Sequence, residues 1–358
     1  MIRLPVSIGE AVDKLTILDI KCKRIQDPER LAFCKQEYDI LYEELKDTVK
    51  TFRYYYDRLL EVNDSIWVMQ DDIRVMKNPD GQKCVEILNK NDMRFRIKDA
   101  INHISQSVIR EKKGYAKQIA LFMGHMGLGD HIGLIGAVRY ASLQYDEIHI
   151  PCFLKNLETL KSFYSDTPSI KFIVINGGYV VRPTNTNRGE CIHVPPNVFA
   201  AVLRSGFYTL PHHDMNDLPS CFYRDLNLDP AIRHTYFHVP DNEPSHTLYS
   251  IVKSQAYIFV QQVSSSNVTP IIKWDVKDIL TIDPNMNVYQ QDHPWYDLAQ
   301  QFVNKPFSHY YETIKHAVEI HTVDSSFYCL ASYLPLDANV KVCYNRETGE
   351  PISTYTFS

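Results

Sequence analysis

The sequence predicts an α/β protein in which two Rossmann-like halves follow an all-helical N-terminal region. Three observations lead to this prediction. Residues 1–112 carry apolar side chains at helical spacing together with helix-capping signals. From about Tyr115, strand-like apolar runs alternate with helical runs, which is the pattern of βαβ units and a parallel sheet. A polar stretch rich in Pro and His, at residues 211–245, is expected to be a linker or a set of loops between two such runs.

Composition supports a folded protein and excludes several classes. The chain has 358 residues, a formal net charge of -5 and 44% hydrophobic residues, which suits two or three domains with real cores. The mildly acidic balance argues against a nucleic-acid binder. No apolar run reaches the ~18 residues of a membrane span, and the first residues lack a signal-peptide layout. The eight cysteines form no Cys-x-x-Cys pair, so we expect a cytoplasmic, reduced protein without structural zinc.

Four helices are expected in the N-terminal region. Their apolar residues recur every three or four positions, and the second stripe is long enough for a helical hairpin or a coiled-coil arm. The boundary signals are a capping box at residues 7–10, a helix start at Asp27-Pro28, an N-cap at Asp64, a turn at residues 78–81 and a C-cap at Gly114.

The two α/β runs are expected to build parallel sheets. The expected strands are 118–123, 147–150, 171–175 and 191–194 in the first run, and 257–260, 279–282, 318–322 and 340–344 in the second. The expected helices are 131–143, 154–163, 295–303, 310–317 and 325–333.

A glycine-rich loop joins the first of these strands to its helix. Gly127 and Gly129 would let backbone N–H groups approach a ligand at a helix N-terminus. The spacing to Gly133 is one residue too long for a dinucleotide fingerprint, which disfavours NAD-type binding. Asp130 could accept a proton from a substrate hydroxyl, or it could merely cap the helix. His131 is the reserve base, because an imidazole titrates near neutral pH.

Two polar loops follow strands of the second run, where ligands bind in open α/β sheets. Their hydroxyl and amide groups would suit a pyrophosphate or sugar hydroxyls, although an ordinary Asp/Ser helix cap is the better explanation of the second loop taken alone. The chain has no Asp-x-Asp for a metal–diphosphate complex, so we expect neither a metal nor a cofactor. The candidate substrate-binding residues are Gln261, Ser264, Ser265, His321, Thr322, Asp324, Ser325 and Ser326.

Residues 5–18 resemble the P-V-S-x-G-E-x-x-D-K-x-T-I-L opening of an uncharacterised bacterial helical family, and residues 63–72 and 91–102 resemble it too. The resemblance covers most of residues 1–112 and implies no known activity. We expect this region to serve assembly or acceptor placement, with homo-oligomerisation through the helices.

From Gln118 onward the chain resembles a GT-B glycosyltransferase. Residues 127–132 are similar to the G-x-G-D-x-I opening of heptosyltransferase-like enzymes, whose Asp is the proposed catalytic base, a role that falls here on Asp130. The Thr and Pro that usually follow this motif are absent. Residues 321–326 are similar to the donor-side strand–turn–helix of GT-B enzymes, which holds the nucleotide diphosphate.

This resemblance implies a glycosyltransferase of the hexosyl or pentosyl class, active in glycan biosynthesis. Residues 113–245 would form the acceptor domain and residues 246–358 the nucleotide-sugar donor domain. The enzyme would be metal-independent and inverting, with an acceptor hydroxyl as the second substrate. Two alternatives stay open, namely a sugar-nucleotide epimerase on the same fold and a non-catalytic nucleotide-sugar binder or scaffold. Transfer or hydrolysis of a donor separates the transferase from the binder, and product analysis separates it from the epimerase.

Overall fold

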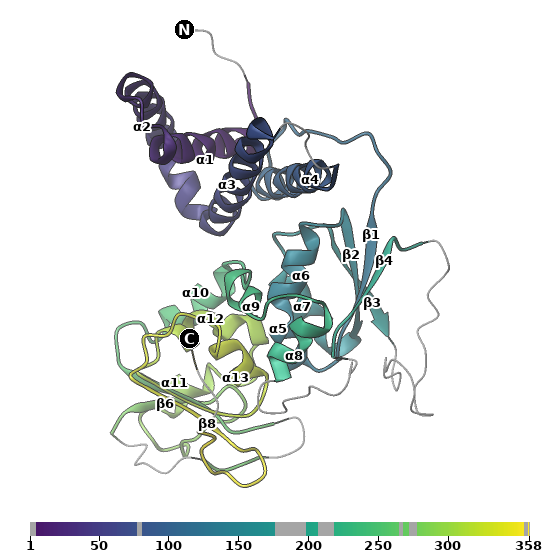
Figure 1. Cartoon of the computed structure of the whole chain (residues 1–358). Coiled ribbons are helices and arrows are strands. Elements are labelled where there is room, and N and C mark those ends of the chain that lie inside the picture. Colours follow the sequence, from purple (N-terminus) through teal and green to yellow (C-terminus); the bar gives the residue numbers. More distant parts are fainter. Residues whose placement is uncertain are drawn as a thin grey trace.

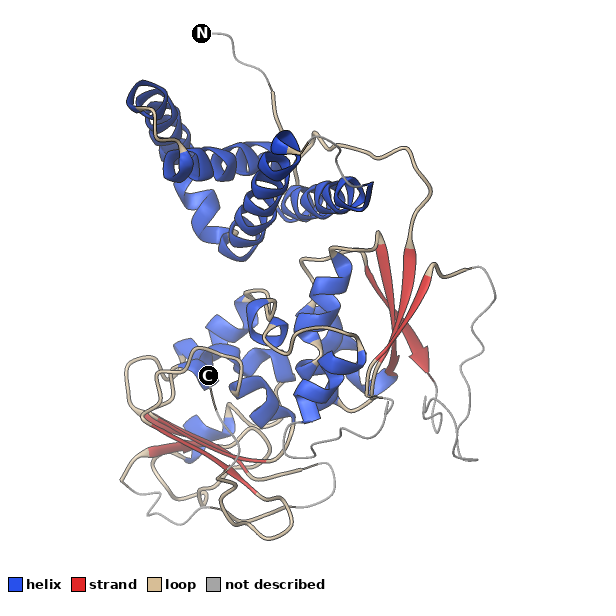
Figure 2. Ribbon diagram, in the orientation of Figure 1, coloured by secondary structure: helices blue, strands red, loops and turns tan. Residues whose placement is uncertain are grey.

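A helical region precedes two separate parallel sheets, with helices between them (Figure 1). The computed structural model describes residues 5–76, 81–175, 198–206, 218–264, 268–271, 278–353 and 357. The predicted α/β class with a preceding all-α region is confirmed (Figure 2). None of the helices in these residues is long and apolar enough to cross a membrane.

The described residues of the N-terminal region form four helices, and two predicted caps are confirmed. The Ser7 hydroxyl accepts a hydrogen bond from the Glu10 backbone N–H at 3.2 Å. The Asp27 carboxylate accepts one from the Arg30 N–H at 2.8 Å. Each bond satisfies a donor that a helix start leaves unpaired. The helices are α1 (Ile8–Arg24), α2 (Pro28–Thr51), α3 (Arg53–Val75) and α4 (Gly81–Ile104).

Two predicted boundaries in this region are wrong. Asp64 begins no helix, because α3 already starts after a break at Phe52, whose φ is -106° and ψ is 31°. Asp64 lies within α3 and accepts two hydrogen bonds from the Arg24 guanidinium, both at 2.8 Å. Gly114 does not cap α4, because the helix has already ended before Gln106, which takes a left-handed φ of 52°.

The three stretches that resemble the helical family meet in one polar contact inside the bundle. Asp13 is 2% exposed, and its carboxylate accepts hydrogen bonds from Arg94 Nε at 2.8 Å and Asn63 Nδ2 at 2.9 Å. The Gly9 N–H donates to Asn102 Oδ1 at 2.7 Å. A side chain on Gly9 would collide with the backbone of α4. The residues that α1 shares with this family, Gly9 and Asp13, therefore fix how α1 packs on α3 and α4.

The first sheet has four parallel strands in the order β3-β2-β1-β4. Three of its predicted strands are confirmed, the predicted strand 191–194 lies outside the described residues, and β4 was not predicted. The predicted helix 131–143 is broken at Leu134 into two. The elements are β1 (Ile119–Met123), α5 (Leu128–Gly133), α6 (Ile135–Ser142), β2 (Glu147–Phe153), η1 (Leu154–Asn156), α7 (Leu157–Phe163), β3 (Ile170–Ile175) and β4 (Ala201–Arg204).

The stretch expected to be a linker is partly helical, so that prediction is wrong for its described residues. It contributes α8 (Leu218–Asp225), α9 (Ile232–Thr235) and the start of α10 (Glu243–Ser250). The Tyr223 hydroxyl of α8 donates to the Gly133 carbonyl at 3.0 Å and accepts from the Ala137 N–H at 3.1 Å. These helices are therefore part of the packing around α5 and α6.

The second sheet is also parallel, in the order β6-β5-β7-β8. All four of its predicted strands are confirmed, with no end shifted by more than one residue. Its elements are β5 (Tyr257–Gln261), β6 (Leu280–Ile282), α11 (Tyr296–Gln300), η3 (Phe307–Tyr310), α12 (Tyr311–Lys315), β7 (Glu319–Val323), α13 (Ser326–Ala331) and β8 (Val340–Tyr344).

One hydrophobic cluster extends from the first sheet through the intervening helices to the second sheet. It includes Phe122 of β1, Phe163 of α7, Phe259 of β5 and Phe327 of α13. The two α/β halves therefore pack directly against each other, and loops from both halves can meet at their junction. The predicted domain limits, 113–245 and 246–358, stay a prediction.

Candidate functional site

The glycine-rich loop places Asp130 in the first turn of α5. Gly127 is the N-cap residue, so Asp130 is the third residue of the helix. A Cβ on Gly127 would lie 2.7 Å from Asp130 Oδ2, so the carboxylate folds back over the backbone at the start of the helix. An acid in this position also helps to cap a helix. The capping interpretation therefore holds in part, yet the Asp130 side chain remains 31% exposed.

His125 stands beside this carboxylate, and the sequence analysis did not single it out. Its Nδ1 lies 3.9 Å from Asp130 Oδ2, and its Nε2 lies 2.6 Å from the Gly206 carbonyl oxygen. A carbonyl only accepts, so Nε2 carries a hydrogen and Nδ1 faces Asp130. Gly206 has a φ of 74°, and a Cβ there would lie 2.8 Å from the imidazole. Glycine is therefore required for this contact.

Two charged residues of the second half complete the surroundings of Asp130. Asp324 follows β7, and Arg346 follows β8. The Arg346 guanidinium lies 3.6 Å from Asp324 Oδ2, and its side chain is 45% exposed. Both side chains exert an electrostatic effect on Asp130. Asp130 thus lies near Asp324 and Arg346, and near His125, which is a second cation when it is protonated. These residues follow strands of both sheets.

The pKa of Asp130 is raised above the ordinary value of an aspartate. Burial is the main cause, because removing water disfavours the charged form, and the neighbouring Asp324 charge adds to it. His125, the Gly127 backbone and Arg346 act in the opposite direction. A carboxyl with a raised pKa is a stronger base than a free aspartate, which suits proton abstraction.

The start of α5 packs directly against α13 of the second half. A Cβ on Gly129 would lie 3.1 Å from Cys329 Sγ and 3.8 Å from the Ser326 Cα. The two motifs predicted from the sequence, the glycine-rich loop and residues 321–326, therefore lie side by side. The absence of a side chain at Gly129 serves this packing, and its predicted role in substrate binding stays a prediction.

The two polar loops of the second half also meet, as expected for strand ends of one sheet. Ser325 is the N-cap of α13, and its hydroxyl accepts from the Phe327 N–H at 3.2 Å. The same hydroxyl donates to Gln261 Oε1 at 2.7 Å. Ser264 is 8% exposed, and Ser265 lies outside the described residues.

Two further predicted residues of β7 are enclosed within the sheet. His321 is buried, with Nδ1 at 2.9 Å from the Tyr344 hydroxyl and Nε2 at 3.1 Å from a Glu319 carboxylate oxygen. Thr322 is fully buried in the sheet. The His321 imidazole is thus already hydrogen-bonded within the protein, and the Thr322 side chain has no access to solvent. Direct contact of either side chain with a ligand would require rearrangement.

His131 lies in the interior and not beside Asp130 in the open part of the site. It is 6% exposed, and burial lowers its pKa to about 4, so the imidazole is neutral at pH 7. Its Nε2 has no hydrogen-bond partner among the described residues. A buried neutral imidazole is poorly placed to exchange a proton with an acceptor.

One cluster among the described residues has the geometry of a cation site. Ligand atoms of Asp241, His246 and Glu312 lie within 4.8 Å of one another. These residues belong to α10, α12 and the loop before α10, not to the loops around Asp130. Glu312 is also bonded to Lys315 and His316, which already balance its charge.

Comparisons with known proteins give one family match and several similar solved structures. A protein-family model described as a family of unknown function, DUF6165, matches residues 2–125. No curated protein matches the sequence.

Three solved structures are similar to about two thirds of this chain. The iron-containing dodecameric glycosyltransferase TibC from enterotoxigenic E. coli H10407 has 15% identity and a TM-score of 0.38, covering 66% of this chain and 61% of that one. The E. coli ADP-heptose lps heptosyltransferase II has 12% identity and a TM-score of 0.36, covering 64% and 84%. A glycosyl transferase family 9 protein from Veillonella parvula DSM 2008 has 12% identity and a TM-score of 0.38, and the match covers 69% of this chain and 88% of that one. The chain thus spans 61% of the length of TibC, and likenesses this distant assign no activity to it.

Proposed function

We propose that this protein transfers a sugar from a nucleotide-sugar to an acceptor hydroxyl, on a GT-B arrangement of its two α/β halves. The observation that supports this most directly is the position of Asp130. Its partly exposed carboxylate, with a raised pKa, follows a strand of the first sheet, and the charges of Asp324 and Arg346 of the second half act on it. A proton acceptor from one half thus lies near enough to a cation of the other half to be influenced by its charge, and a displacement between two bound substrates would use both groups.

In the proposed reaction, Asp130 accepts the proton of the acceptor hydroxyl. The acceptor oxygen then bonds to the anomeric carbon, while the bond from that carbon to the diphosphate oxygen breaks and the nucleoside diphosphate leaves. One displacement of this kind inverts the anomeric centre. His125 Nδ1 is close enough to favour the ionised form of Asp130 when the imidazole is protonated.

Arg346 is the residue best placed to stabilise the diphosphate as it leaves. Its guanidinium is half-exposed and held only loosely by Asp324, at 3.6 Å. Guanidinium groups bind phosphate oxygens through paired N–H donors. Gln261 and Ser325 lie on the same sheet edge and complete the proposed donor site. The helical region would support assembly or acceptor placement.

Binding of a donor tests the proposal first. We would measure the melting temperature with UDP-, GDP-, dTDP- and CMP-sugars, then assay transfer and hydrolysis of any donor that stabilises the protein. A donor at ~100 times its dissociation constant should add about 2.7 kcal/mol to the free energy of unfolding. No stabilisation by any nucleotide-sugar, together with no donor turnover, would contradict the proposed function.

Replacement of Arg346 should weaken donor binding. We expect Arg346→Ala to raise the dissociation constant of the nucleoside diphosphate by about 10- to 100-fold, because a hydrogen bond to a charged group contributes about 1.5–3 kcal/mol. Arg74→Ala is the control, since Arg74 pairs with Asp71 on the exposed face of α3. Titration calorimetry measures both variants, and equal affinities would remove Arg346 from the donor site.

The reaction should need no divalent metal, because Arg346 would supply the positive charge at the diphosphate. We expect EDTA-treated protein to keep its full rate of transfer. Loss of activity in EDTA with recovery on addition of manganese would contradict this expectation, and the Asp241–His246–Glu312 cluster would then be the first place to look for the ion.

A further inference from the structure

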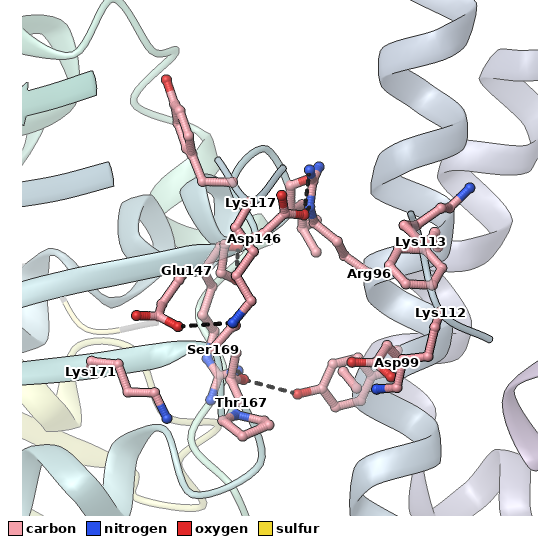
Figure 3. A pocket seen from close by; sticks show the side chains of 18 of the residues that line it. Arg96, Asp99, Lys112, Lys113, Lys117, Asp146, Glu147, Thr167, Ser169 and Lys171 are labelled. Atoms are coloured by element: carbon pink, nitrogen blue, oxygen red, sulfur yellow. Dashed lines mark hydrogen bonds and ion pairs between the residues drawn. The ribbon is translucent and has the colours of Figure 1, made fainter. Parts of the chain in front are cut away.

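A cavity of about 340 Å³ lies between the helical region and the first α/β half, apart from the site around Asp130 (Figure 3). Its size falls in the ordinary range of small-molecule sites. One wall comes from α3 and α4, and the opposite wall comes from α6 and the starts of β2 and β3. The segment that connects α4 to β1 closes a third side with Lys112, Lys113, Tyr115 and Lys117.

The walls carry an excess of positive charge. Lys and Arg side chains outnumber Asp and Glu side chains six to three, the cations being Arg96, Lys112, Lys113, Lys117, Arg139 and Lys171 and the acids Asp99, Asp146 and Glu147. This excess stands against the chain's formal net charge of -5. Asp166 and Glu111, which lie outside these walls, pair with two of the cations, so the remaining positive charge is small and local. On an acidic protein, such a charge favours an anionic ligand.

Two of these cations are free to bind a ligand. Arg96 pairs with Asp146 at 2.9 Å, Lys117 with Glu147 at 3.6 Å and Arg139 with Asp166 at 2.9 Å. Lys113 pairs with Glu111 at 3.5 Å. Lys112 and Lys171 form no ion pair with a described residue. They lie on different walls of the cavity. Each of these two ammonium groups is therefore available to an anion in the cavity.

The other lining groups suit a sugar ring. Tyr115 is 47% exposed, and its hydroxyl is fixed by a hydrogen bond to Asp92 Oδ1 at 2.9 Å. Its ring is thus a positioned aromatic surface on which the apolar face of a sugar can pack. Asp99 and Ser169 add groups that accept hydrogen bonds from hydroxyls.

We propose that this cavity binds a phosphorylated sugar, with its phosphate between Lys112 and Lys171. The cavity lies at the opposite end of the first sheet from the glycine-rich loop, because Lys117 precedes β1 and Ser169 precedes β3. A strand of five or six residues spans about 17–20 Å, so a ligand here is too distant to react at Asp130. The site therefore anchors or senses a second compound, and its occupancy ties the helical region to the α/β part.

The test uses the full chain with a hexose 6-phosphate as probe, and titration calorimetry as the readout. We expect binding of this probe, weaker binding of inorganic phosphate and no binding of the neutral hexose. The double variant Lys112→Gln/Lys171→Gln should weaken hexose phosphate binding by about tenfold or more. Lys161→Gln is the matched control, because Lys161 is an exposed lysine of α7 outside the cavity.

Three results would overturn the proposal. The first is no binding of the hexose phosphate to the folded wild-type protein. The second is equal binding of the probe by the double variant and the Lys161→Gln control. The third is inorganic phosphate that binds as tightly as the hexose phosphate, which would leave an anion site without sugar recognition. Because the readout is binding alone, these results do not depend on whether the glycosyl transfer proposed for Asp130 is correct.

Discussion

Asp130→Asn should lower turnover by roughly two to four orders of magnitude, which is the usual contribution of a general base. Asparagine keeps the size of the side chain and still accepts a hydrogen bond from the start of α5, so the melting temperature should stay near that of the wild type. Donor affinity should persist, because the proposed donor contacts come from Gln261, Ser325 and Arg346. Steady-state rates and calorimetric donor affinities separate the two effects.

The pH profile gives an independent test of the same carboxyl. The pKa of Asp130 is raised, and a base acts only when it is deprotonated. We therefore expect kcat/KM to increase with pH through an apparent pKa above the ordinary ~3.9 of an aspartate. This rising limb should be absent from the residual activity of Asp130→Asn, where no group at this position titrates.

Asp27→Asn is the matched control for Asp130→Asn. Asp27 also lies at the start of a helix and accepts a hydrogen bond from a backbone N–H, but in the helical region. Its replacement should leave turnover unchanged. A fully active Asp130→Asn protein would show that Asp130 only supports the helix. If a folded His131→Asn protein were then inactive, the base would be His131, despite its burial and its pKa of about 4.

Signals that act over a few residues were readable from the sequence. The caps at Ser7 and Asp27 depend on contacts three residues apart, and strands of the two sheets are buried apolar runs. Asp64 shows the limit of such signals, because a possible helix cap and a mid-helix partner of Arg24 look alike in sequence. The break that begins α3 is at Phe52, which carries no turn or capping signal.

The candidate site was predictable only where it follows a strand. Asp130 and Ser325 were found because loops after parallel strands share one edge of a sheet. His125 was missed, since its contact with Gly206 depends on how distant parts of the first half pack together. Arg346 was missed, since its place near Asp130 depends on the packing of one half against the other. Arg346 lies more than two hundred residues from Asp130 in the chain. Likewise, the polar stretch before residue 245 is helical because α8 packs on α5 and α6 through Tyr223, a contact that composition does not reveal.

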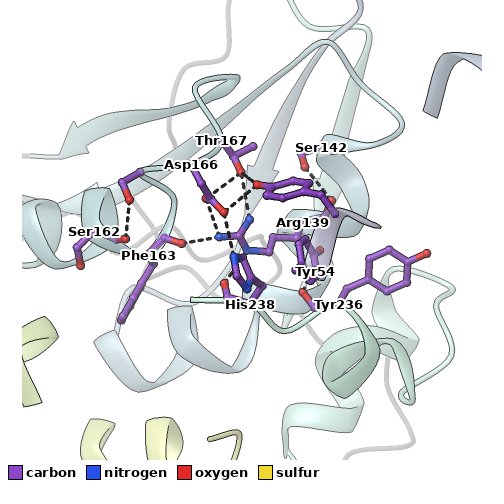
Figure 4. A network of polar contacts seen from close by, with 11 residues as sticks. Tyr54, Arg139, Ser142, Ser162, Phe163, Asp166, Thr167, Tyr236 and His238 are labelled. Carbon is purple, nitrogen blue, oxygen red and sulfur yellow. Dashed lines mark hydrogen bonds and ion pairs between the residues drawn. The ribbon is translucent and has the colours of Figure 1, made fainter. Parts of the chain in front are cut away.

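A buried ion pair in the first α/β half accepts a hydrogen bond from the helical region (Figure 4). The Arg139 guanidinium donates to Asp166 Oδ1 at 2.9 Å, and these side chains are 2% and 6% exposed. The Tyr55 hydroxyl of α3 donates to Asp166 Oδ2 at 2.7 Å. Arg139 also donates to the carbonyls of Phe163 and His238, at 2.8 and 2.7 Å. The pair is therefore almost fully satisfied by hydrogen bonds.

Asp166→Ala should lower the free energy of unfolding by about 3–5 kcal/mol, because it leaves the Arg139 charge buried without its partner. Urea denaturation measures this loss. The control is Glu158→Ala, which breaks the Lys161–Glu158 pair, with side chains 54% and 83% exposed, and should cost only about 0–1 kcal/mol. A loss as small for Asp166→Ala as for the control would show that the pair contributes little.

The acid dependence of stability should distinguish Asp166 from its neighbours. Burial opposes ionisation, but Arg139 and His238 outweigh it and hold the pKa of Asp166 well below its ordinary range. A lowered pKa in the folded state stabilises the protein above the unfolded value of ~3.9, and this stabilisation is lost as the pH falls below that value. The difference in unfolding free energy between wild type and Asp166→Asn should therefore be constant near neutral pH and shrink below about pH 4.

Tyr55→Phe, which removes only the hydroxyl that reaches Asp166 from α3, should lower the free energy of unfolding by about 1 kcal/mol and keep this pH dependence.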